Sequence, residues 1–143
     1  MIIMGVDFGD ARTGLAVCDK TELIASRAGL VEGGFKKALN GTAAKAKELG
    51  AELIVVGNPI NMDGSEGPRS QRCKDFASEL QALSGIPVVL YDERLTTVTA
   101  HSFLSMSGLD SRQHKKHVDE LSARLILEDY MKMKKNREES QNG

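Results

Sequence analysis

The segment ELIVVG at residues 52–57 constrains the fold more than any other part of the chain, because after its first residue it is a continuous apolar run. A short run of this kind is typical of a strand that is covered on both faces of a sheet. Helical patterns lie on both sides of it in the sequence, and helices can supply such cover. The run therefore predicts a strand inside an α/β fold.

Three further strands are predicted before this run, at residues 2–8, 13–18 and 25–32, and their short connections indicate an antiparallel meander. After it, strands alternate with helices, which favours parallel addition to the same sheet. The remaining expected elements are helices at 35–49, 68–84, about 97–107 and about 117–133, and a strand at 86–92. This order predicts a mixed five-stranded sheet flanked by helices, the layout of a ribonuclease H-like domain, although other α/β arrangements remain possible.

The composition is that of one globular domain: 143 residues, 41% hydrophobic and 27% charged. We expect a single domain over residues 1–133 and a polar tail over 134–143. The two cysteines, Cys18 and Cys73, form no metal-ligand pattern and fit a reducing, cytoplasmic setting, and we find no membrane or signal segment. A net charge of −1 neither favours nor excludes a nucleic-acid partner.

Three carboxylates occupy places where an acid needs an explanation. Asp7 is the only charge in the first strand, Glu93 directly follows a buried strand, and Asp119 lies at the N-terminal end of an apolar helical stripe. Each also has an ordinary explanation: hydrogen bonds from the glycine turn for Asp7, a surface pair with Arg94 for Glu93, and a favourable helix-dipole interaction for Asp119. Together they predict a cluster of acids at one end of the sheet.

Such a cluster points to bound divalent cations. Mutual repulsion would raise the pKa values of the carboxylates unless a cation neutralises them. Mg²⁺ or Mn²⁺ prefers all-oxygen ligands, and two such ions can activate a water and stabilise the leaving oxygen in phosphodiester hydrolysis.

Four motifs in this order resemble the YqgF family, bacterial proteins described as Holliday junction resolvases and as pre-16S rRNA nucleases. They are GVDFGDARTGLAVCD (5–19), VVGNPINMDGSEGPR (55–69), YDERLTT (91–97) and KKHVDELSARLIL (115–127). The resemblance extends from Met1 to about Lys132. It implies a ribonuclease H-like fold similar to that of RuvC-type resolvases.

The resemblance also implies that Asp7, Glu93 and Asp119 form the acidic triad that holds two Mg²⁺ or Mn²⁺ ions. In resolvases the middle acid lies at the end of an earlier strand, and here the corresponding strand ends in Gly57-Asn58-Pro59 without an acid. The assignment of Glu93 therefore depends on the family's own motif, and Asp92 is its nearest competitor.

Candidate substrate-binding residues lie beside these acids. Arg12 and Arg94 could hold phosphates of the substrate, or each could pair with a local carboxylate. Arg69 and Arg72, in the first turns of a predicted helix, could add positive charge there, and Asn58 could line the rim of the site. His117, two residues before Asp119, is a further candidate.

The leading hypothesis is a metal-dependent endonuclease that acts on the 5′ end of precursor 16S rRNA, and a resolvase of branched DNA would use the same chemistry. An actin-like or sugar-kinase-like ATPase would need a second domain that 143 residues cannot supply. A non-catalytic RNA-binding or transcription-associated factor is the third possibility. With only 4% aromatic residues, recognition would depend on backbone and shape more than on base stacking.

Overall fold

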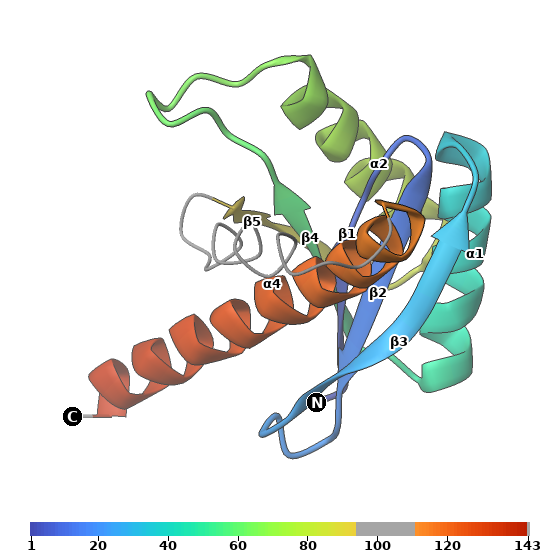
Figure 1. Ribbon diagram of the computed structural model, residues 1–143. Helices are drawn as coiled ribbons and strands as arrows, with labels where there is room; N and C mark the ends of the chain where they lie inside the picture. The colour runs from blue at the N-terminus through green and yellow to red at the C-terminus, as the bar shows by residue number, and fades with distance from the viewer. Residues whose placement is uncertain (94–110, 143) are drawn as a thin grey trace.

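The computed structural model describes the backbone of residues 1–93 and 111–142, and the side chains of residues 1–93 and 120–140. Its strands are β1 (Ile3–Asp7), β2 (Arg12–Cys18), β3 (Ala25–Glu32), β4 (Leu53–Asn58) and β5 (Val88–Asp92). Within the described residues these five strands form one sheet in the order β3-β2-β1-β4-β5 (Figure 1). The predicted mixed five-stranded sheet is confirmed.

Strand β1 is the centre of the sheet and the place where its direction changes. Val6 of β1 pairs with Leu15 of antiparallel β2 on one side and with Val56 of parallel β4 on the other. Strand β5 continues the parallel half, with Asn58 opposite Asp92. The carboxyl ends of β1, β4 and β5 therefore lie along the same edge of the sheet.

Helices cover both faces of the sheet (Figure 1). Helices α1 (Phe35–Leu49) and α2 (Pro68–Ser84) pack on one face, and α4 (Ser111–Asn142) crosses the other. The alternation of β1 divides its side chains between two clusters: Met4 and Val6 lie on the α1 and α2 side, and Ile3 lies on the α4 side. Each cluster is a separate hydrophobic layer.

The ends of α1 and α2 follow from their glycines and proline. Gly50 adopts a left-handed conformation with φ 71° directly after α1, and Gly85 does the same after α2 with φ 72°. Pro68 occupies the first turn of α2, where the missing N–H costs nothing. Both helices have the bounds that the sequence predicts.

Helix α4 is longer than its apolar pattern predicts. We expected a helix from about 117 to 133 and a solvated tail from 134, whereas the helix runs from Ser111 to Asn142. The segment contains no Gly or Pro and is rich in Lys, Arg, Glu and Gln, which favour helix without any apolar contact. Its last turns extend beyond the sheet (Figure 1). The expected helix at 97–107 lies outside the described residues.

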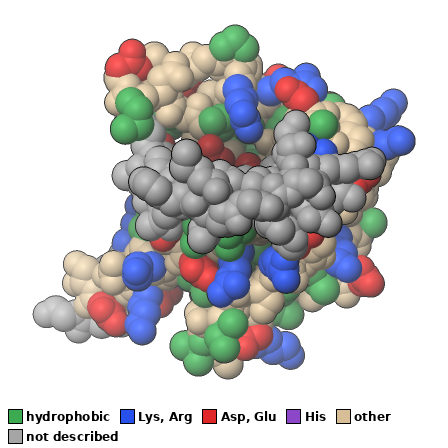
Figure 2. Space-filling view, viewed as in Figure 1, with side chains coloured by type: hydrophobic (Ala, Val, Ile, Leu, Met, Phe, Trp, Pro, Cys, Tyr) green, Lys and Arg blue, Asp and Glu red, His purple; other side chains and the backbone are tan. Residues whose placement is uncertain are grey.

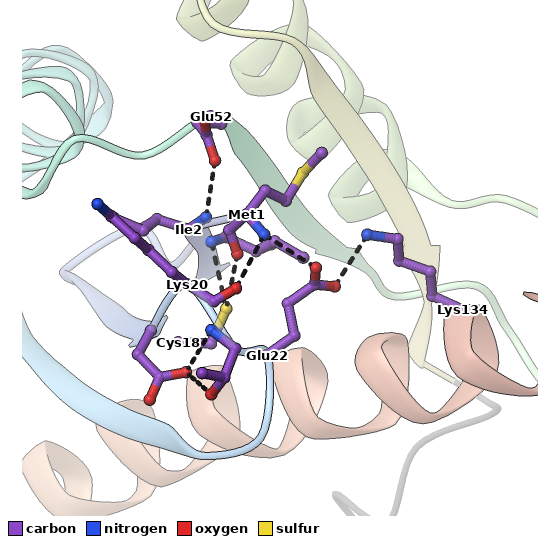
Figure 3. Close-up of polar contacts among 10 residues, drawn as sticks. Met1, Ile2, Cys18, Lys20, Glu22, Glu52 and Lys134 are labelled. Atoms are coloured by element: carbon purple, nitrogen blue, oxygen red, sulfur yellow. Dashed lines mark hydrogen bonds and ion pairs between the residues drawn. The ribbon is translucent and has the colours of Figure 1, made fainter.

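The turn between β2 and β3 is fastened to α4 (Figure 3). Glu22, which has a positive φ of 57°, accepts a 2.8 Å hydrogen bond from Lys134 of α4 and a 2.9 Å bond from the Met1 ammonium group. Burial alone would raise the pKa of Glu22, but these bonds lower it overall. Beneath the turn, the Cys18 thiol accepts a hydrogen bond from the Ile3 N–H at 3.3 Å. The Lys134–Glu22 bond thus attaches α4 to the end of the sheet opposite Asp7.

Among the described side chains that Figure 2 shows, none of the regions carries a single charge sign. Basic and acidic side chains are interspersed over α4 and along the rim (Figure 2). Across residues 1–93 and 111–142, none of the helices has the length and apolarity required to cross a membrane.

Candidate active site

Asp7 ends β1 on the side of the sheet that α4 covers. It shares a face with Ile3 and Gly5 by strand alternation, and a Cβ placed at Gly5 would lie 2.8 Å from the Ala123 carbonyl oxygen of α4. The absence of a side chain at Gly5 therefore lets the helix backbone approach the sheet directly below Asp7.

Glu93 brings a second carboxylate to the same place. A Cβ placed at Gly57 would lie 2.5 Å from Glu93 Oε1 and 2.6 Å from Ile126 Cδ1, so the Glu93 carboxylate fills the space that a side chain at 57 would take. Because β1 and β4 pair in parallel through Val6 and Val56, Asp7 and Gly57 are the next residues of the two strands. The structure thus brings Glu93 beside Asp7, at the end of the strand that lacks an acid of its own.

The environment of Glu93 opposes its ionisation. Burial raises the pKa of its carboxyl, Arg69 acts in the opposite direction, and the neighbouring Asp92 raises the pKa further. A carboxyl in this state gains from any additional positive charge that enters the site.

Asp119 belongs to α4, and its side chain lies outside the described part of the helix. Its backbone position is one turn before Ala123, the residue whose carbonyl faces Gly5. The side chain of His117 is likewise not described, and Arg94 lies outside the described residues.

The predicted cations occupy different surroundings. Arg12 is the first residue of β2 and is partly exposed. Arg69 is exposed at the start of α2 and interacts electrostatically with Glu93. Arg69 also lines a hollow between α2 and the turn after β1, together with Phe8, Gly9, Asp10, Pro68 and Arg72. Arg69 is therefore a predicted cation that lies within electrostatic reach of Glu93.

Asn58 faces the opposite side of the sheet from Glu93. It is 5% exposed, and its Oδ1 accepts a 2.7 Å hydrogen bond from the Ser70 hydroxyl of α2. A neighbour that sequence reasoning did not assign is Gly57, which makes room for Glu93. Arg72, which was expected only to add positive charge, bonds to Asp10 at 2.7 Å. The available signal for Gly57 was a glycine at the end of a buried strand, whereas no sequence pattern predicts the contact of Arg72 with Asp10.

The described side chains do not by themselves complete a metal site. Among them, no group of three His, Cys, Asp or Glu residues is close enough to hold an ion. Asp7 and Glu93 nevertheless offer oxygen ligands at a shared edge, which is the donor chemistry that Mg²⁺ and Mn²⁺ prefer.

This architecture, with acids along the carboxyl edge of a mixed sheet, defines a ribonuclease H-like domain. RuvC of Thermus thermophilus, solved in complex with a Holliday junction substrate, is similar in fold with a TM-score of 0.55. It is 16% identical, and the match covers 93% of this chain and 96% of that RuvC chain. A second structure of Thermus thermophilus RuvC gives a TM-score of 0.53 at the same identity and coverage. At this identity the likeness shows the fold alone.

The family itself follows from sequence comparison. The family model of RuvX, described as Holliday junction resolvase, matches residues 1–133. A protein of Syntrophus aciditrophicus named "Putative pre-16S rRNA nuclease" is 37% identical over 132 residues, which are 92% of this chain and 88% of the relative. A protein of Ruminiclostridium cellulolyticum with the same name is 36% identical over 92% of this chain and 94% of its own length. The chain belongs to the RuvX family, also called YqgF, and the resemblance seen in its four motifs is confirmed.

Proposed function

We propose that this protein is a cytoplasmic, metal-dependent endonuclease that hydrolyses phosphodiester bonds in precursor 16S rRNA. The observation that carries the proposal is the Glu93 carboxylate, which is half-buried over Gly57 beside the end of β1, where Asp7 lies. The names of relatives that match most of the chain support the substrate.

Asp7, Glu93 and Asp119 would hold Mg²⁺ or Mn²⁺, and two ions fit the chemistry of this class. When bound, the ions supply an activated water and neutralise charge on the leaving oxygen. The raised pKa of Glu93 supports this assignment, because a buried carboxylate of this kind gains more from a cation than an exposed one does.

The other predicted residues divide into two roles. Arg69, and with it Arg12 and Arg94, would contact phosphates that flank the scissile bond. Asn58 would act through the fold, because its hydrogen bond to Ser70 ties the end of β4 to α2. Under this proposal the acids would lie at the centre of the site and the cations at its rim.

Cleavage of a Holliday junction is the second candidate function. It is favoured by the description of the family model and uses the same acids. Both substrates present a phosphodiester backbone, so the described side chains do not separate RNA from branched DNA.

The deciding experiment compares cleavage of a labelled precursor 16S 5′ fragment with that of a four-way DNA junction, each with Mg²⁺, Mn²⁺ or EDTA. We expect metal-dependent RNA cleavage by the wild type and a loss of at least about 100-fold in Asp7→Asn. Cleavage of the junction alone would transfer the assignment to a resolvase. A folded, metal-binding protein that cuts neither substrate would favour the non-catalytic factor.

Gly57→Ala tests the placement of Glu93 without removing a carboxylate. The new methyl group must displace Glu93 or Ile126, and a displacement of about 1 Å can cost about 100-fold in rate. If the loss acts through Glu93, Gly57→Ala will add little to the defect of Glu93→Gln. Fully multiplicative defects would mean that Gly57 acts elsewhere.

A further inference from the structure

Arg72 of α2 contacts two residues of the short turn that follows β1. Its Nε donates a 2.7 Å hydrogen bond to Asp10 Oδ1, and its guanidinium carbon lies 5.9 Å from the centroid of the Phe8 ring. Phe8 and Asp10 flank Gly9 in this turn. One guanidinium group therefore connects two residues of the turn, Phe8 and Asp10, from a separate helix.

The ring of Phe8 is itself fixed in a cluster of aromatic side chains. It stacks on Phe76 at 4.4 Å and 16° and meets Phe35 edge-on at 5.6 Å. Arg72 also lies 5.3 Å from the centroid of Phe35, so it covers two rings of the cluster. Phe8 is only 4% exposed, and its ring has little freedom to move.

This arrangement controls the backbone next to Asp7. Successive side chains of a strand point to opposite faces, so a Phe8 ring fixed on the α2 side directs Asp7 to the α4 side. The Arg72–Asp10 bond then fixes where the chain turns after Phe8. The direction of the Asp7 carboxylate thus depends on contacts made on the far face of the sheet.

The ion pair is poorly suited to a stabilising role. The side chains of Arg72 and Asp10 are 47% and 78% exposed, and exposed pairs contribute at most about 1 kcal/mol. A guanidinium group that stacks on rings while its Nε donates to an acid has a fixed geometry that lysine cannot reproduce.

We propose that Arg72 is a positioning residue, which sets the direction of the Asp7 carboxylate by holding Phe8 and Asp10 in the turn after β1. Its consequences for metal binding and cleavage rest on the proposed function, in which Asp7 is a metal ligand. The contact of Arg72 with the turn does not depend on that function.

The test uses Arg72→Gln and Arg72→Lys, with Arg124→Gln as the matched control. Arg124 of α4 also donates from Nε to an acid, Glu128, at 2.8 Å, and its side chain is 45% exposed. For both Arg72 variants we expect a Kd for Mn²⁺ raised about 10-fold and a lower kcat with KM nearly unchanged. Thermal unfolding in EDTA should remain close to that of the wild type, and Arg124→Gln should change none of these quantities.

Three results would overturn the proposal. A raised KM with an unchanged Kd for Mn²⁺ would make Arg72 a phosphate ligand. A large fall in Tm with normal metal binding in the protein that remains folded would make its role purely structural. Full rescue by Arg72→Lys would show that charge alone matters.

Amide hydrogen exchange separates this proposal from the proposed function. Exchange at Gly9 and Asp10 should accelerate in Arg72→Gln and not in Arg124→Gln, whether or not the protein binds metal. Unchanged exchange would overturn the positioning role even in an active nuclease. Accelerated exchange in a protein that neither binds Mn²⁺ nor cleaves would preserve the contact and refute only the nuclease assignment.

Discussion

The Glu93 carboxylate is held in a position that favours its protonated form. Burial is the main cause, and the charge of Asp92 adds to it, while Arg69 offsets part of the effect. Since the pKa in the folded protein is raised above the unfolded value, the contribution of Glu93 to stability is fully present below its unfolded pKa. It is lost as the pH rises through the folded pKa.

Glu93→Gln should therefore become more stabilising as the pH rises in metal-free protein. The amide keeps the shape of the side chain without the charge that burial opposes. We expect the Tm of Glu93→Gln minus the Tm of the wild type, both measured in EDTA, to increase between about pH 5 and about pH 8. Added Mg²⁺ should reverse the order at the higher pH, because only the carboxylate gains from the ion.

Glu79→Gln, which changes an exposed acid on α2, is the control for this measurement. A stability difference that stays constant with pH in EDTA would contradict the prediction. It would mean that Arg69 already neutralises Glu93.

At the residue scale, the sequence marks the candidate acids more clearly than their neighbours. Asp7 stands out because it is one charge in an apolar strand. The orientation of Asn58 could not be predicted in the same way, because a strand that is apolar on both faces carries no alternation to show which residue faces α2. The proximity of Glu93 to Gly57 could not be predicted from the sequence either, because it brings a residue that follows β5 next to the neighbouring strand β4.

At the scale of elements, α4 packs on β1 through a glycine and so depends on a close approach of two backbones. A Cβ at Gly5 would lie 2.8 Å both from the Ala123 carbonyl oxygen and from Leu127 Cβ. A helix backbone cannot move aside as a flexible side chain can. Because Asp119 is one turn before Ala123, any displacement of α4 moves the third acid relative to the other two.

Gly5→Ala should lower both stability and activity. The overpacked contact should cost about 1–3 kcal/mol in the free energy of unfolding, measured by urea denaturation. Cleavage should fall further than the fraction of folded protein does. Gly41→Ala is the matched control, because its Cβ would lie 2.8 Å from a Val31 side-chain atom at the packing of α1 on β3. Equal losses of activity in both variants would contradict a specific role for the α4 contact.

The elements themselves differ in how far the sequence predicts them. Helix α1 and helix α2 end at glycines in left-handed conformations, and such a glycine can be recognised from the local sequence alone. Helix α4 lacks such stops, and its polar last turns are supported by intrinsic propensity and by the Lys134–Glu22 bond. An apolar period cannot reveal where a helix of that kind ends.

At the scale of the whole molecule, the sheet separates two hydrophobic layers, and each contains one cysteine. Cys73 lies in the layer of α1 and α2, and Cys18 lies in the layer of α4. Burial is the main cause that raises the pKa of Cys73, to about 12, and burial also raises that of Cys18. Both thiols are therefore protected from reagents that require a thiolate until their layer opens.

Thiol labelling in increasing urea can show whether the two layers open together. The central strand β1 contributes side chains to both layers, with Met4 on one side and Ile3 on the other, so we expect one cooperative unit. The labelled fractions of Cys18 and Cys73, located by peptide mass spectrometry, should then rise at the same urea concentration, and Mg²⁺ should shift both to higher urea. Earlier labelling of Cys18 would show instead that α4 detaches while α1 and α2 remain packed. In that event the three acids would separate before the domain unfolds, and loss of cleavage would precede loss of the fold.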